Sequence, residues 1–135
     1  MKKLRFTYVL FLAVTLVLSC TYGNTTSDAQ LITAEEMQTI LDLEDAQLID
    51  VRTPEEYDEY RVAHSQNIDF QSPTFDEDIA KLDKEKPVIL YCKTGNRSAI
   101  CAKKLKAAGF KKIYDLKGGI SKWKHDDILD IEIKS

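Results

Sequence analysis

A cysteine directly follows an apolar run, and a short loop with two cations comes after it. The apolar run ends at Cys92, and the loop 93–98 contains Lys93 and Arg97. A cysteine reacts as its thiolate, which nearby positive charge and backbone N–H groups stabilise. The first turn of a helix supplies both partial positive charge and N–H groups that lack partners. The sequence therefore predicts Cys92 as a nucleophile between a strand and a helix; the alternative is a buried core cysteine before an ordinary basic turn.

The elements that must position this loop alternate in type along the chain. Thr33 begins a capping-box pattern, and Thr53 precedes Pro54 as the N-cap of a second helix. The apolar runs predict strands at 31–32, 46–51, 66–69, 86–91 and 112–116. The remaining helices are expected at 75–82, at 98–108 before Gly109, and around Trp123.

Strands separated by helices at this spacing indicate an α/β fold. We expect a mostly parallel central sheet of about five strands, flanked by helices on both faces. Ligands of such sheets bind beyond the carboxyl ends of the strands, which is where Cys92 lies. The tail 126–135 is ambiguous, and its three isoleucines and one leucine are compatible with a short edge strand.

The N-terminal residues have the layout of a secretory signal. A basic opening at residues 1–5 precedes an apolar stretch at 6–18, which is short for a membrane span. Residues 16–20 resemble a bacterial lipobox, in which Cys20 is lipidated after cleavage. We expect a signal peptide at 1–19, a lipidated tether at 20–30 and a folded domain at 31–135, anchored in the bacterial cell envelope and facing the periplasm or the exterior. An uncleaved anchor helix or another type of signal is the alternative.

Composition and cysteine usage narrow the choice of function. The chain has 135 residues, enough for one domain, and its net charge of −3 with no basic stripe argues against nucleic-acid binding. Cys101 lies among apolar residues, which favours a buried core thiol. A resolving thiol that pairs with Cys92 is the alternative, and it would make the protein a thiol-redox partner.

Three blocks of the sequence resemble the rhodanese-like family, in the order and spacing that the family shows. They are LIDVRTPEEY at 48–57, CKTGNRS at 92–98, and the stretch 108–123 with IYDLKGGI and Trp123. The segment 60–67 departs from the family, because Tyr60 and His64 stand where glycines are usual. This departure concerns the local turn and the rim of the site.

The resemblance implies sulfur transfer without a cofactor. Cys92 would take the outer sulfur of thiosulfate or a persulfide and pass it to cyanide, a small thiol or a thioredoxin-like protein. Asp50 and Arg52 would support the loop as a structural pair. The residues expected to bind the substrate are Lys93, Thr94, Gly95, Asn96, Arg97 and Ser98.

Other chemistries fit the sequence less well. Phosphatases of this fold place one more residue between their cysteine and arginine, which widens the loop for a phosphoryl group. A cysteine protease needs an activating histidine, and neither His64 nor His125 stands in a supporting motif. The spacing of histidines and cysteines predicts no metal site. A non-catalytic module that binds an anion or a partner stays open as the second hypothesis.

Overall fold

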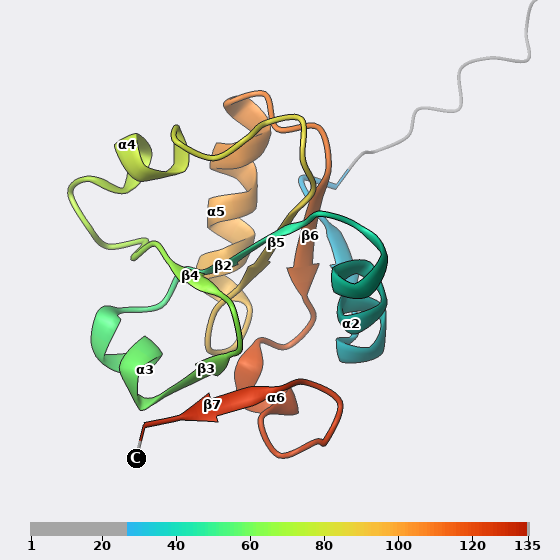
Figure 1. Ribbon diagram of the computed structural model, residues 1–135. Helices are drawn as coiled ribbons and strands as arrows, with labels where there is room; N and C mark the ends of the chain where they lie inside the picture. Colours follow the sequence, from blue (N-terminus) through green and yellow to red (C-terminus); the bar gives the residue numbers. More distant parts are fainter. Residues whose placement is uncertain (1–26, 135) are drawn as a thin grey trace, which may run out of the picture.

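Five parallel strands form the centre of the computed structural model, which describes residues 27–134 (Figure 1). The strand order is β1-β6-β5-β2-β4, and every neighbouring pair is parallel. The strands are β1 (Gln30–Ile32), β2 (Gln47–Asp50), β4 (Gln66–Asn67), β5 (Val88–Tyr91) and β6 (Ile113–Leu116). The predicted α/β architecture with a parallel central sheet is confirmed.

The helices are short and connect successive strands. They are α2 (Ala34–Leu43), α3 (Pro54–Glu59), α4 (Phe75–Ile79), α5 (Asn96–Ala107) and α6 (Ile120–Trp123). None of the helices within residues 27–134 has the length and apolar character needed to cross a bilayer. The proposed signal peptide and Cys20 lie outside the described residues.

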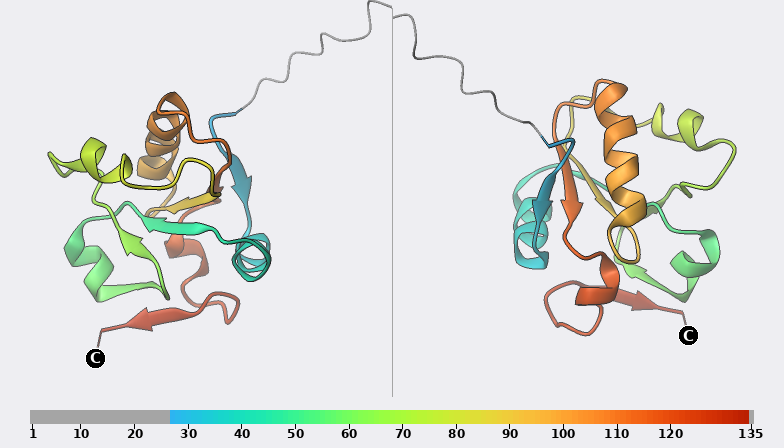
Figure 2. Two further views of the ribbon diagram at one scale, coloured as in Figure 1. Left: turned by 45° about the horizontal axis from the view of Figure 1, so that its top comes forward. Right: turned by 180° about the vertical axis from the view of Figure 1, so that it is seen from behind.

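Two hydrophobic cores cover the two faces of the sheet, because successive strand residues point to opposite sides. On one face, Val88 and Leu90 of β5 pack with Phe75 of α4 and Leu105 of α5. On the other face, residues of α2 and α6 join Ile89 and Tyr91, and all four β5 residues are buried. Figure 2 shows α5 and α2 on different sides of the sheet. A strand buried on both faces is typical of parallel sheets. Because Cys92 directly follows β5, it lies at the end of a buried central strand.

The C-terminal tail contains a short strand, and it lies in a sheet separate from the central one. Strand β7 (Ile131–Ile133) pairs antiparallel with β3 (Tyr60–Val62) in a separate two-stranded sheet. Figure 1 shows this pair beside α6, beyond the carboxyl ends of the central strands. The tail therefore closes the end of the molecule at which Cys92 lies, instead of extending the central sheet.

Local sequence explains where the first two helices begin. The side chain of Thr33 accepts a hydrogen bond from the Glu36 amide, and the Glu36 carboxylate accepts one from the Thr33 amide. Thr53 and Glu56 make the same reciprocal pair at α3, where Pro54 is the first helical residue. Both capping boxes satisfy amides that a helix start otherwise leaves without partners.

Candidate active site

The sulfur of Cys92 faces backbone amides at the start of α5. Its Sγ accepts hydrogen bonds from the amides of Gly95, at 3.1 Å, and Ser98, at 3.5 Å. The Ser98 hydroxyl lies 3.4 Å from the same sulfur. The Cys92 side chain is only 1% exposed, so these groups replace water around it. Amides that converge on one atom at a helix N-terminus stabilise an anion there.

Gly95 gives the active-site loop (Cys92–Ser98) its shape. Its φ of 100° lies in the left-handed region that glycine adopts without strain. The same residue is the N-cap of α5, and its carbonyl accepts from the Ala99 amide at 3.2 Å. Its N–H can therefore point back at Cys92 while its carbonyl begins the helix.

The carbonyls of the loop are held by α6. The Ile120 amide donates to the Cys92 carbonyl at 2.9 Å, and the Ser121 amide donates to the Lys93 carbonyl at 3.1 Å. Gly119 packs so closely that a Cβ atom there would overlap the backbone of Lys93. Because these carbonyls are bonded on the α6 side, the loop can present N–H groups to the sulfur.

The other residues expected to bind substrate differ in their surroundings. The side chains of Lys93, Thr94 and Asn96 are exposed at the surface, and none of them is among the groups that hydrogen-bond to the Cys92 sulfur within residues 27–134. Ser98 is buried against that sulfur. The structure thus brings Gly95 and Ser98 to the thiol and leaves three polar side chains at the rim.

Arg97, which the resemblance implied as a substrate-binding residue, is paired with a carboxylate of the protein itself. Its two terminal nitrogens donate to both carboxylate oxygens of Glu56, at 2.6 and 2.9 Å. These hydrogen bonds lower the pKa of the Glu56 carboxyl to about 2 and raise the pKa of Arg97. Glu56 was not predicted as a site residue. Its position in the capping box of α3 was the available signal, but that pattern does not identify Arg97 as a partner.

Asp50 and Arg52 form a buried ion pair behind the site. The Arg52 side chain donates to Asp50 at 2.7–3.0 Å and to the Tyr60 carbonyl at 2.6 Å. Both side chains are at most 1% exposed. Burial opposes the charge on Arg52, but its hydrogen bonds to the Asp50 carboxylate outweigh this effect, and the pKa of Arg52 is raised. The pair ties the end of β2 to the start of β3, and neither side chain is among the groups that hydrogen-bond to the Cys92 sulfur in residues 27–134.

A second carboxyl group that the sequence did not single out lies under the loop. Asp115 of β6 is 2% exposed, and its Oδ1 atom has no hydrogen-bond partner among the described residues. Burial raises its pKa to about 6, although the Ser98 hydroxyl limits the rise. Burial, with the charge of Asp115 as a smaller cause, also raises the pKa of Cys101 to about 12. Cys101 is therefore a thiol that rarely ionises at neutral pH.

The segment that departs from the family keeps a backbone shape suited to glycine. His64 has a φ of 62°, the one positive value among non-glycine residues of the described chain. The buried Ser65 next to it bonds the Val62 carbonyl and the Tyr91 hydroxyl, at 2.7 and 2.9 Å. The turn is thus held by side-chain hydrogen bonds where the family uses glycine.

Within residues 27–134, no three side chains of the metal-ligating types are grouped as a metal site requires.

The sequence is similar to those of known rhodanese-like proteins and sulfurtransferases. The family model for the rhodanese-like domain matches residues 33–126. The thiosulfate sulfurtransferase GlpE of Coxiella burnetii is 38% identical over 80 residues, which are 59% of this chain and 73% of GlpE. The probable adenylyltransferase/sulfurtransferase MoeZ of Mycobacterium tuberculosis is 42% identical over 76 residues, 56% of this chain, but the match spans only 19% of MoeZ.

Solved structures show the same fold. A rhodanese-like domain protein of Staphylococcus aureus has a TM-score of 0.65 and 29% identity, covering 78% of this chain and 99% of that one. The polysulfide-sulfur transferase of Wolinella succinogenes has a TM-score of 0.61 and 33% identity, covering 73% of this chain and 75% of that one. With its parallel sheet, its cysteine loop and these matches, the chain belongs to the rhodanese-like domain family.

Proposed function

We propose that the protein is a sulfurtransferase that carries sulfane sulfur as a persulfide on Cys92. In the first step the Cys92 thiolate attacks the outer sulfur of the donor. A bond forms between Sγ and that sulfur, the donor's S–S bond breaks, and its electron pair leaves with sulfite or a thiolate. In the second step a thiol or cyanide removes the outer sulfur and returns Cys92 to its thiolate.

The observation that carries this proposal is the pair of amides aimed at the Cys92 sulfur. Each step passes through negative charge on Sγ or on the sulfur attached to it, and preorganised N–H groups stabilise such charge without rearrangement. Fixed donors at 3.1 and 3.5 Å are already in place in this chain. A loop that served only as a basic turn would not need its amides directed at a buried thiol.

Intact-mass measurement on the folded domain tests the proposal. After exposure to thiosulfate or glutathione persulfide, the protein is expected to gain the mass of one sulfur atom, and cyanide should remove it. Cys92→Ser should gain nothing, whereas Cys101→Ala, the matched control, should load like the unaltered protein. An unchanged mass with every donor, together with thiosulfate binding that survives in Cys92→Ser, would instead establish a binding module.

The redox alternative receives little support from the site. Cys92 and Cys101 are both free thiols and both are buried. The raised pKa of Cys101 makes it a poor attacking group, because the thiolate is the reactive form. Sulfur transfer requires only Cys92, which agrees better with these surroundings.

We also propose that the domain works in the bacterial cell envelope, attached through lipid on Cys20. The support is the sequence alone: the basic opening, the short apolar stretch and the lipobox-like residues 16–20. The donor would be a small sulfur compound, and the acceptor a small thiol or a thioredoxin-like protein.

A further inference from the structure

The charge of Arg97 is already paired before any donor arrives. The guanidinium binds both oxygens of Glu56, and the two side chains are 23% and 26% exposed. Glu56 is fixed from its other side as well, because the Thr53 amide donates to the same carboxylate at 3.1 Å. The pair is therefore a fixed part of the site wall, held by α3 on one side and α5 on the other.

This pairing leaves little net positive charge near the thiol. Arg52 is paired with Asp50 in the same way. Lys93 is the loop cation that makes no ion pair within residues 27–134, and it is exposed to solvent, where water screens its charge. The groups that contact the sulfur are thus neutral, and the arginine of the same loop belongs to a neutral ion pair.

Sulfur donors differ in how much charge they bring to such a site. Thiosulfate carries two negative charges and leaves as sulfite, also doubly negative, so its reaction with a thiolate gathers three negative charges. An alkyl persulfide brings at most one and leaves as a thiolate. Only the first reaction needs an unpaired cation to offset strong repulsion.

We propose that Glu56, by occupying Arg97, makes the site selective for singly charged persulfide donors over dianionic oxyanion donors such as thiosulfate. The inference rests on the sulfurtransferase function proposed above and names its donor class. Glu56 acts through Arg97 and is a specificity-determining residue, with no role in the bond-forming step.

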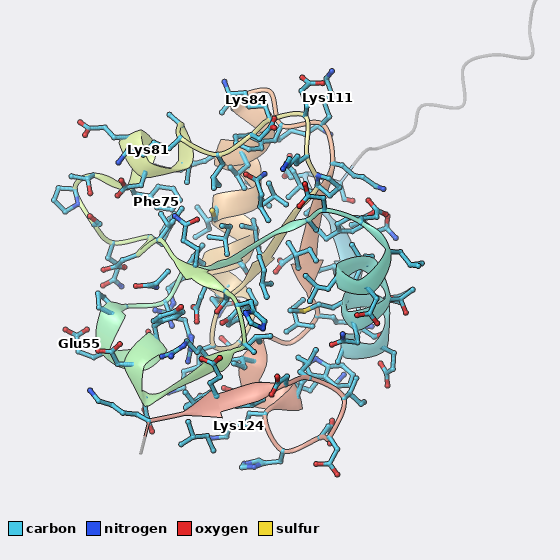
Figure 3. All side chains as sticks on the ribbon, viewed as in Figure 1. Glu55, Phe75, Lys81, Lys84, Lys111 and Lys124 are labelled. Carbon is cyan, nitrogen blue, oxygen red and sulfur yellow. The ribbon has the colours of Figure 1, made fainter. Side chains whose placement is uncertain are left out.

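The test compares Glu56→Gln with Glu55→Gln in steady-state assays. Glutamine keeps the N3 position of the capping box and removes the charge. Glu55 is exposed on the outer side of the same helix turn (Figure 3). With cyanide as the common acceptor, kcat/KM is measured for thiosulfate and for 2-hydroxyethyl persulfide, in which the persulfide is the only ionisable group.

In Glu56→Gln, the ratio of the thiosulfate to the persulfide kcat/KM should rise about tenfold, mainly through a lower KM for thiosulfate, as expected for one unit charge acting on a dianion nearby. Glu55→Gln should leave the ratio unchanged. Glu56→Ala serves as a second variant and should move the ratio in the same direction.

Two results would overturn the inference. An equal change for both donors in the two Glu56 variants, or the same shift in Glu55→Gln, would mean that the ion pair only holds the loop, and sulfur transfer itself would stand. Failure of the unaltered protein to load sulfur from either donor would remove the proposed function and the inference together.

Discussion

Beneath the active-site loop, the Asp115 carboxyl is buried without a full set of hydrogen-bond partners. A carboxylate in such a place loses the water that would stabilise its charge, and its proton is held more tightly than in the unfolded chain. Residues of this kind are costly to stability, and they are retained where a polar group serves the site. Here the site group that acts on the pKa of Asp115 is the Ser98 hydroxyl, which also lies 3.4 Å from the Cys92 sulfur.

The first prediction concerns the pH dependence of stability. The ordinary pKa of this carboxyl is 3.8, and folding raises it to about 6. Between these values the unfolded chain releases the proton while the folded domain keeps it, so the free energy of unfolding falls as pH rises. Asp115→Asn should remove this fall and stabilise the domain at pH 8 by up to about 3 kcal/mol. Urea unfolding at pH 4.5 and at pH 8 measures it.

The control for this experiment is Asp127→Asn, since Asp127 is exposed. It should leave the difference between the two pH values unchanged. If Asp115→Asn and the unaltered domain lost stability in parallel from low to high pH, the buried carboxyl would not be the group responsible.

At the scale of elements, α6 and the glycines before it determine the shape of a loop that lies more than twenty residues earlier in the sequence. The amides of Ile120 and Ser121 bond the carbonyls of Cys92 and Lys93, and Gly119 lets the two backbones meet. The sulfur-facing amides come from the N-cap of α5 and from its first turn. Two helix starts thus hold opposite sides of one loop.

We predict that Gly119→Ala impairs sulfur transfer. The new Cβ would overlap the Lys93 backbone, and the φ of 66° adds strain, so the loop must move. We expect a loss of about 2 kcal/mol or more in the free energy of unfolding, and sulfur loading at least about tenfold slower. Thermal unfolding and the loading rate of Cys92 by intact mass are the measurements.

Gly109 offers a matched control at the far end of α5. It also has positive φ, 93°, but a Cβ there meets nothing within 4 Å. Gly109→Ala should cost stability through the backbone alone and leave the loading rate intact. Equal loading rates in the two alanine variants would show that close packing at residue 119 is irrelevant to the loop.

Signals that lie close together in the sequence predicted the elements well. The starts of α2 and α3 were predicted from Thr33, Thr53 and Pro54, because capping depends on residues within one turn. The strand leading to Cys92 was equally clear. Strand β3 was missed, because its three residues have no pattern of their own and pair only with β7, about seventy residues later. The partner of the tail strand β7 could not be identified for the same reason.

The same distinction applies to the site. The thiol and the helix start beside it are neighbours in sequence, so the sequence alone was enough to predict that helix amides would lie close to the Cys92 sulfur. The Glu56–Arg97 pair joins residues 41 positions apart. The many acidic residues of the chain show that a carboxylate is available to pair with Arg97, but they do not identify which one pairs with it. That choice depends on how α3 packs beside α5, a tertiary contact.

At the scale of the whole molecule, the proposed chemistry lies in the described domain, whereas the proposed membrane attachment lies in the N-terminal residues. Residues 27–134 contain the complete sheet and the loop, while the lipobox-like residues precede them. Lipid on Cys20 would hold the domain at a membrane surface, since a lipoprotein with several chains is stably anchored.

We expect Cys20→Ala to abolish fatty-acid labelling and to release the protein from the membrane fraction of bacterial cells. The reason is that no described helix could provide a span in its place. Cys92→Ser, which leaves the N-terminal residues unaltered, should remain in the membrane fraction. Membrane association that persists in Cys20→Ala would indicate an uncleaved N-terminal helix.

The bonds from α6 to the active-site loop also bear on how the chain is made. A ribosome releases Cys92 and most of α5 well before residues 119–121 emerge. Until then the carbonyls of Cys92 and Lys93 lack the two donors that fix them in the finished domain. A nascent or truncated chain that ends before Gly119 therefore lacks the donors that fix the loop around Cys92, and these surroundings are completed only once residues 119–121 have been added.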